Sequence, residues 1–225
     1  MAHPAVVIMA KVPYPGQVKT RLCPPLSSWQ AASLARAFVF DKIAQVRTLT
    51  GARAALAYSP ASGDDFFGDV APDFTLIAQQ GPDLSARLIH VVDYFLSLGD
   101  AGVLAIDSDT PTLPTAYLQQ AIMLMADPAV DVVLGPSEDG GYYLIGMRTL
   151  QRTLFEDMPW STAEVTPETL RRASVLGLNV AQVPPWFDVD TPADLARLKT
   201  ALSVCDSAAP QHTRQVLLGL ETSFE

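Results

Sequence analysis

Short apolar runs alternate with longer segments of helical spacing along most of the chain. Residues 5–10 (AVVIMA) are continuously apolar, and Val103–Ile106 form a similar run that stops abruptly at Asp107. Such runs are typical of strands that are covered on both faces. Because strands and helices alternate, we predict an α/β fold in one domain, with a largely parallel central sheet and helices on both faces.

The same pattern gives the expected boundaries. The strands are expected at residues 5–10, 52–58, 74–78, 103–106, 131–134, 142–145 and 179–183. Helices are expected at residues 28–48, 84–98 with Asp83 as N-cap, 114–126, and after an N-cap at Thr191. A capping box from Ser161 to Glu164, or the segment 166–168, starts another helix that ends at Gly177. Residues 59–72, rich in Gly, Asp and Pro, are expected to form a loop.

Composition narrows the class of protein. The chain has 225 residues, 49% of them apolar and 17% charged, which suits one large domain. We expect that domain to span residues 1–202, with 203–225 as an unassigned tail that has weak helical spacing at 215–220. A net charge of −9 argues against a nucleic-acid partner. We expect no membrane span and no signal peptide, and the two distant cysteines, Cys23 and Cys205, fit a cytoplasmic protein.

Two aspartates follow directly after the buried run at 103–106. Asp107 and Asp109 are separated by one residue. They lie at the carboxyl end of the expected strand, which is where ligands bind in open α/β sheets. Two carboxylates about 5 Å apart repel by roughly 3 kcal/mol at an effective dielectric constant near 20. A divalent cation is the simplest group that would offset this repulsion. The alternative is that one aspartate caps the next helix and the other is solvated.

A basic stretch follows the first strand. Lys11, Lys19 and Arg21 lie within it, and the segment 14–17 (YPGQ) has the Pro and Gly that a type II turn requires. Such a loop could present cations and backbone N–H groups to a phosphate. It is not a P-loop, because the G-x-x-x-x-G-K-[ST] pattern is absent. The alternative is that Lys19 and Arg21 are solvated loop charges.

Two further acidic segments follow later strands. Asp188 and Asp190 repeat the spacing of the first acidic pair, and capping does not explain them. Glu138 and Asp139 precede a Gly-Gly pair, Gly140 and Gly141, which permits either close approach of a ligand or a tight hairpin turn.

Several chemistries have little support. The chain has no G-x-S-x-G elbow and its three histidines are scattered, which argues against a Ser-His-Asp hydrolase. It has no H-E-x-x-H segment or cysteine cluster for zinc, and no G-x-G-x-x-G for a dinucleotide. An aspartyl-phosphate phosphatase would need Thr or Val where this chain has Pro111.

Five motifs in order resemble a bacterial family. MAKVPYPGQVKTRL, IDSDTPTLP, LGPSEDGGYYLIGM, PWSTAEV and FDVDTPADL are similar to the DUF2064 or glycosyltransferase-like transferase 1 family, over residues 5–202. That family resembles in fold the molybdenum-cofactor guanylyltransferase and 2-phospholactate guanylyltransferase. The resemblance implies a Rossmann-like GT-A fold and a nucleotide or nucleotide-sugar donor.

The resemblance also implies roles for individual residues. Lys19 and Arg21 would bind the phosphates of the donor and, with Asp109, act in catalysis. Asp107 and Asp109 would bind Mg²⁺ or Mn²⁺, and Asp188 or Asp190 would supply a further ligand. The remaining donor-site residues would be Lys11, Gly16, Gln80, Gly81, Asp83 and Arg87. The acceptor side would be formed by Glu138, Asp139, Gly140 and Gly141.

One segment departs from the family pattern. Residues 80–87 read QGPDLSAR, with Ser85 and Ala86 where the family usually has Gly and Glu.

From the motifs together we expect a metal-dependent transferase that moves a glycosyl or nucleotidyl group from a nucleotide-activated donor to a small acceptor. The alternative is a nucleotide-binding module that has lost catalysis and acts as a partner or sensor.

Overall fold

A seven-stranded sheet forms the centre of the computed structural model, which describes residues 2–204 and 210–221. The strands are β1 (Ala5–Lys11), β2 (Arg53–Ser59), β3 (Thr75–Ala78), β4 (Val103–Ile106), β5 (Val132–Pro136), β6 (Tyr142–Met147) and β7 (Val180–Gln182). Their order in the sheet is β3-β2-β1-β4-β6-β5-β7. β6 is antiparallel to its neighbours β4 and β5, and the other pairs are parallel. The predicted α/β fold is confirmed.

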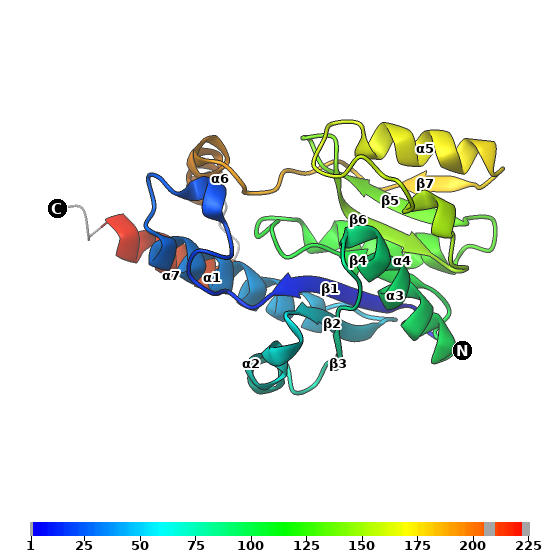
Figure 1. Ribbon diagram of the computed structural model, residues 1–225, viewed down its shortest axis with the longest axis horizontal. Helices are drawn as coiled ribbons and strands as arrows, with labels where there is room; N and C mark the ends of the chain where they lie inside the picture. The colour runs from blue at the N-terminus through cyan, green and yellow to red at the C-terminus, as the bar shows by residue number, and fades with distance from the viewer. Residues whose placement is uncertain (1, 205–209, 222–225) are drawn as a thin grey trace.

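Helices cover both faces of the sheet (Figure 1). On one face lie α1 (Ser28–Arg47), α2 (Asp64–Val70) and α4 (Thr115–Ala126), and on the other α3 (Leu84–Ser97) and α5 (Val165–Val175). Short 3-10 helices are η1 (Thr20–Leu22), η2 (Ala61–Gly63) and η3 (Arg152–Leu154). Within the described ranges, no helix is long and apolar enough to cross a membrane.

β1 is buried because its side chains alternate between the two helical layers. Val6 and Ile8 join the core beneath α1, α2 and α4, whereas Ala5 and Val7 join the core beneath α3 and α5. All four side chains are at most 1% exposed. This explains why the sequence shows a continuous apolar run there instead of an alternating one.

A third apolar cluster joins α6 (Pro192–Val204) and α7 (Gln211–Glu221) to α1. These three helices gather at the end of the molecule to which β1 points (Figure 1). Asp41 on α1 caps α7, because its carboxylate accepts hydrogen bonds from the backbone N–H groups of His212 (3.0 Å) and Thr213 (2.8 Å). The division into a domain of residues 1–202 and a tail stays a prediction.

Local turn and cap predictions were largely confirmed. The N–H of Gln17 donates to the carbonyl of Tyr14 (3.0 Å), and Gly16 has the positive φ of 77° that a type II turn requires. The Asp83 side chain accepts from the N–H of Ala86 (2.8 Å) and caps α3. The Asp194 carboxylate accepts from the N–H of Thr191 (2.7 Å) at the start of α6.

Two local predictions were wrong. Residues 59–72 are not a loop, because they contain α2, which buries Phe67 against the sheet. Burial of this side chain outweighs the loop signals of the surrounding Gly and Asp residues. The capping box at 161–164 does not form: Ser161 has a φ of 64°, and Glu164 occupies the N-cap position of α5 with no side-chain cap bond. The segment 166–168 was the better indicator of the start of this helix.

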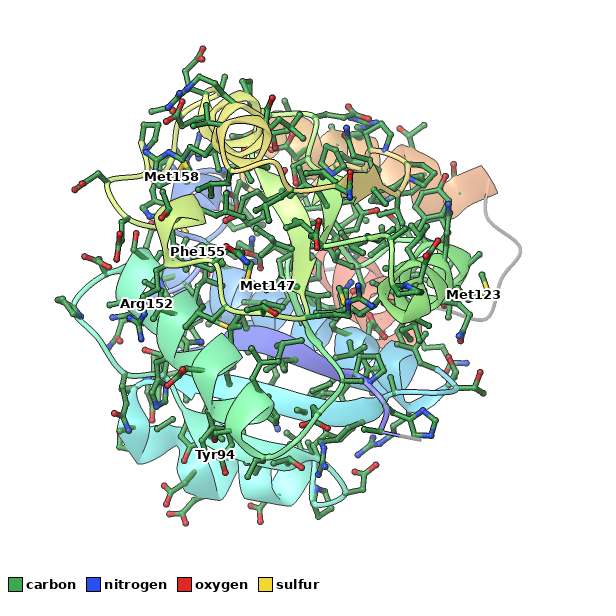
Figure 2. The ribbon with its side chains drawn as sticks, turned by 90° about the vertical axis from the view of Figure 1, so that its right-hand side faces the viewer. Tyr94, Met123, Met147, Arg152, Phe155 and Met158 are labelled. Atoms are coloured by element: carbon green, nitrogen blue, oxygen red, sulfur yellow. The ribbon has the colours of Figure 1, made fainter. Side chains whose placement is uncertain are left out.

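The parallel strands begin at the edge of the sheet that Figure 2 faces. Met147 lies there, at the end of β6, paired with Val103 at the start of β4. Arg152 lies beyond the end of β6, on η3, and is exposed. The opposite edge, where the parallel strands end, therefore collects the acidic and basic loops.

We predict that Asp41→Ala loosens α7. The variant removes the carboxylate that caps this helix, a loss of about 1–3 kcal/mol. The midpoint of thermal unfolding should fall by several degrees, at roughly 2–4 °C per kcal/mol for a domain of this size. Amide hydrogen exchange should rise at residues 213–220. Asp69→Ala, at an exposed position on α2, is the matched control, and unchanged exchange in α7 would contradict the prediction.

Candidate functional site

The candidate site lies where the order of the sheet reverses. β1 pairs with β2 on one side and with β4 on the other, and β2 and β3 lead away from β4. The register aligns Ile8 with Ile106, so the residues after β4 follow level with the end of β1. In open α/β sheets, ligands bind at the carboxyl ends of the strands at such a switch point.

A cleft of about 430 Å³ opens at this point. Its volume is in the range of small-molecule sites, about 300–1,000 Å³. The lining comes from the end of β1, the loop that follows it, α1, the residue after β3, the start of α3, the loop after β4 and the segment before α6: Met9, Ala10, Lys11, Gln17, Val18, Lys19, Thr20, Arg21, Ala35, Val39, Gln79, Leu84, Arg87, Ser108, Asp109 and Asp190.

Another cleft, of about 330 Å³, lies between η3 and α5. Its two arginines are already engaged: Arg171 and Arg172 both donate to Glu168, and Arg172 also donates to the carbonyl of Thr153. These contacts hold η3 against α5, so the cleft at the switch point is the better candidate.

Lys19 is the central cation of the cleft. Its Nζ lies 2.9 Å from Oδ1 of Asp109 and 2.7 Å from Oδ1 of Asp190, and its side chain is only 5% exposed. Burial lowers the pKa of Lys19, but attraction to both aspartates outweighs burial, so the pKa lies above its ordinary value. The backbone of Lys19 is in the left-handed region (φ 49°), which is uncommon for a residue with a side chain.

Arg21 lies beside this ion pair and remains largely exposed. Its Nη1 is 3.8 Å from Oδ2 of Asp190, and its side chain is 71% exposed. Lys19 and Arg21 both line the cleft, as does Lys11. The basic stretch predicted to bind phosphates therefore does face one cavity.

Alternating burial brings the second acidic pair to the first. Phe187 and Val189 are buried (6% and 0% exposed) in the cluster that α1 shares with α6 and α7. Asp188 and Asp190, the residues between and after them, are only partly buried. The N–H of Val189 donates to the carbonyl of Asp109 (3.1 Å), which ties the two acidic segments together.

The carboxylates of Asp107 and Asp188, the first member of each acidic pair, have perturbed pKa values. Burial raises the pKa of Asp107, and attraction to Lys42 partly opposes this. Burial also raises the pKa of Asp188 to about 6, with further repulsion from Asp139 and Asp190. Asp139, predicted for the acceptor side, therefore lies close enough to Asp188 to repel its carboxylate.

The loop between β5 and β6 is held in a tight turn. Gly140 has a φ of 95°, and a Cβ there would lie 2.4 Å from the backbone of Ala163. The N–H of Gly141 donates to Oδ1 of Asp139 (2.9 Å). Both carboxylate oxygens of Glu138 accept from Arg197 on α6 (2.5 and 2.8 Å). An acceptor-binding role for Glu138, Asp139, Gly140 and Gly141 stays a prediction.

The segment before α3 only partly faces the cleft. Gln79, which the sequence reasoning missed, lines the cleft, as does Arg87 on α3, whereas Gln80, Gly81 and Asp83 do not. Gly16, in the loop after β1, is outside the lining as well. Ser85, at the departure from the family pattern, donates to the carbonyl of Phe155 (2.5 Å) and accepts from Nε1 of Trp160 (2.8 Å). Ser85 thus anchors the segment around Phe155, which Figure 2 labels.

Sequence reasoning also missed Lys42 and Thr110. Both are buried just behind the first acidic pair, with Lys42 1% and Thr110 0% exposed. One signal was present, since Lys42 continues the row Leu34–Phe38 at intervals of four on α1. A lysine in an apolar helical row indicates a buried charge that needs partners.

The four aspartates expected to bind a metal ion do not form a metal centre in this arrangement. Within residues 2–204 and 210–221, no group of three or more His, Cys, Asp or Glu side chains is placed to hold a metal ion. The Lys19 ammonium lies where a cation bridging Asp109 and Asp190 would lie. A divalent cation could bridge them only after Lys19 leaves, so Mg²⁺ or Mn²⁺ binding stays a prediction.

Comparison with known families and structures gives two strong matches. The family described as "Uncharacterized protein conserved in bacteria (DUF2064)" matches residues 42–162. The crystal structure of a proposed nucleotide-diphospho-sugar transferase from Desulfovibrio desulfuricans is 32% identical, with a TM-score of 0.88 over 99% of this chain and 96% of the other. A comparison with curated proteins finds no match.

More distant structures share the fold. CMP:2-keto-3-deoxy-manno-octonic acid synthetase in complex with CTP is 14% identical, with a TM-score of 0.58 over 90% of this chain and 99% of that one. Glucosyl-3-phosphoglycerate synthase from Mycobacterium tuberculosis, in complex with Mn²⁺ and UDP, is 12% identical, with a TM-score of 0.51 over 97% and 79%. At these identities the likeness shows the fold alone.

We predict that Lys19→Gln strengthens the binding of Mn²⁺ alone, because Asp109 and Asp190 lose the ammonium that bridges them. Hydrogen bonds to charged groups contribute about 1.5–3 kcal/mol, so we expect at least about tenfold tighter binding. Electron paramagnetic resonance of free Mn²⁺ measures the affinity. Arg21→Gln removes the same charge from an exposed side chain and should change the affinity much less. Equal affinities in the wild type and in Lys19→Gln would contradict the prediction.

We predict that Asp188 makes the stability of the folded protein depend on pH. The pKa of Asp188 is about 6 in the folded protein, against about 3.9 in an unfolded chain. Between these values the folded state holds a proton that the unfolded state lacks, so Asp188 reduces stability as pH rises from about 4 to 6. Asp188→Asn should therefore raise the unfolding midpoint at pH 7 but not at pH 4. A midpoint difference that does not vary with pH would refute this, and Asp69→Asn is the control.

Proposed function

Because this chain belongs to the DUF2064 family, we propose that it is a transferase that moves a group from a nucleotide-activated donor to a small acceptor. The donor would bind in the cleft at the switch point between β1 and β4. The cleft has the size of a small-molecule site and lies where this fold class binds ligands.

The observation that carries the proposal is the placement of Lys19. A buried ammonium has been brought to the wall of a cleft, with its charge maintained by Asp109 and Asp190. Arg21 supplies an exposed second cation beside it. Two adjacent cations that line one cavity match the negatively charged phosphates of a nucleotide donor.

Lys19 and Arg21 would act on the leaving group. In nucleotidyl transfer the acceptor oxygen attacks the α-phosphorus and pyrophosphate leaves; in glycosyl transfer it attacks the anomeric carbon and a nucleoside diphosphate leaves. Negative charge grows on a phosphate oxygen in both reactions. Fixed cations at that oxygen stabilise the transition state more than the ground state.

We expect the binding of Mg²⁺ or Mn²⁺ to depend on the binding of the donor. Phosphates that bind Lys19 compete with Asp109 and Asp190 for its ammonium, and this competition can free the two carboxylates. We therefore expect metal and donor to bind more tightly together than either does alone.

We predict that one donor class stabilises the protein against heat. The test measures thermal unfolding with each of the four ribonucleoside triphosphates and several nucleotide-sugars, with and without Mn²⁺ or Mg²⁺. A ligand at 100 times its dissociation constant adds about 2.7 kcal/mol, which should raise the midpoint by several degrees. A shift with one triphosphate indicates nucleotidyl transfer, and a shift with a nucleotide-sugar indicates glycosyl transfer.

Matched variants test the placement of the donor. Arg21→Gln should reduce the shift, whereas Arg152→Gln, the same charge change on η3 beyond the far end of β6, should leave it unchanged. If a donor binds but no acceptor turns over, the nucleotide-binding module is the better description. No shift with any donor in the presence of metal would overturn the proposal.

A further inference from the structure

Lys42 is a buried lysine that does not line the cleft. It lies on α1 and is 1% exposed, yet its Nζ has three oxygen partners. These are Oε1 of Gln45 (3.1 Å), the carbonyl of Thr110 (3.1 Å) and Oγ1 of Thr110 (2.9 Å). An ammonium group has three N–H donors, so these three acceptors satisfy it completely.

The hydroxyl of Thr110 connects this lysine to the acidic pair. Thr110 is fully buried, and its Oγ1 lies 2.7 Å from Oδ1 of Asp107. Because the ammonium can only donate, Oγ1 accepts from Lys42 and its single proton points to Asp107. Lys42 thus determines the direction of the hydrogen bond that reaches the carboxylate.

The position of Lys42 is itself supported from the loop before α4. Oε1 of Gln45 accepts from Lys42, while Nε2 of Gln45 donates to the carbonyl of Leu113 (2.5 Å). α1 therefore holds the whole loop between β4 and α4 from behind. Burial lowers the pKa of Lys42, and attraction to Asp107 opposes this, so the arrangement has a cost that ordinary core packing would avoid.

We propose that Lys42 and Thr110 are positioning residues, which fix the orientation of the Asp107 carboxylate beside Asp109 at the edge of the donor site. This inference rests on the proposed function, because it assigns a purpose to Asp107 only if phosphates or metal bind there. Neither Lys42 nor Thr110 would touch the donor. Their effect would reach it only through the one oxygen of Asp107 that Thr110 holds.

The test compares Thr110→Val with Thr110→Ser. Valine keeps the branched shape and removes the hydroxyl, whereas serine keeps the hydroxyl and removes only a methyl group. The probe is Mn²⁺-pyrophosphate, titrated calorimetrically well below the unfolding midpoint of each variant. We expect Thr110→Val to bind at least about tenfold more weakly than the wild type, and Thr110→Ser to stay within about threefold.

Each outcome has one meaning. Weak binding by Thr110→Val with rescue by Thr110→Ser supports the inference. Equal binding by all three proteins overturns it, and equal weakening in both variants overturns it in favour of packing. If the wild type itself does not bind the probe, the donor site and this inference fail together, which the first titration already reveals.

A double variant guards against misfolding. Thr110→Val leaves a buried ammonium short of one acceptor, so it could unfold for that reason alone. Lys42→Met combined with Thr110→Val removes the charge and its hydroxyl partner together, so that no buried ammonium is left short of an acceptor. This double variant should fold and still bind Mn²⁺-pyrophosphate at least about tenfold more weakly. Wild-type affinity in the double variant would overturn the inference.

Discussion

Repulsion among the carboxylates at one edge of the sheet is the constraint on which the site depends. Asp107 and Asp109 follow β4, and the backbone bond from Val189 to Asp109 brings Asp188 and Asp190 to them. Two carboxylates about 5 Å apart would repel by roughly 3 kcal/mol at an effective dielectric constant near 20. The chain offsets this with two lysines of different accessibility: Lys19 in the wall of the cleft and Lys42 behind it.

The two lysines suit different tasks because of where their partners lie. Lys19 pairs with Asp109 and Asp190, which are 43% and 38% exposed, so an incoming anion can compete for its ammonium. Lys42 is enclosed by Gln45 and Thr110 and is out of reach of any ligand in the cleft. One cation can therefore exchange partners during binding, while the other keeps Asp107 oriented throughout.

Hydrophobic burial, and not the polar residues themselves, places the charged groups. Leu22, the last residue of η1, is fully buried in the same apolar cluster as Phe38. Phe187 and Val189 join this cluster from the other end of the chain. These contacts bring the basic loop and the second acidic pair together across more than 160 residues of sequence, as the Lys19–Asp190 separation of 171 shows.

The sequence by itself determined the elements and most of the charged positions of the candidate site. Apolar runs, caps and the type II turn depend on neighbouring residues, and so the strands, Asp83 as a cap and the turn at Gly16 could be predicted. Only the tertiary structure decided which charges meet. It paired Lys19 with the carboxylates expected to bind metal and placed Lys42 behind Asp107. The physical reason is that an ion pair depends on distance in space, and strand order sets that distance between residues far apart in the chain.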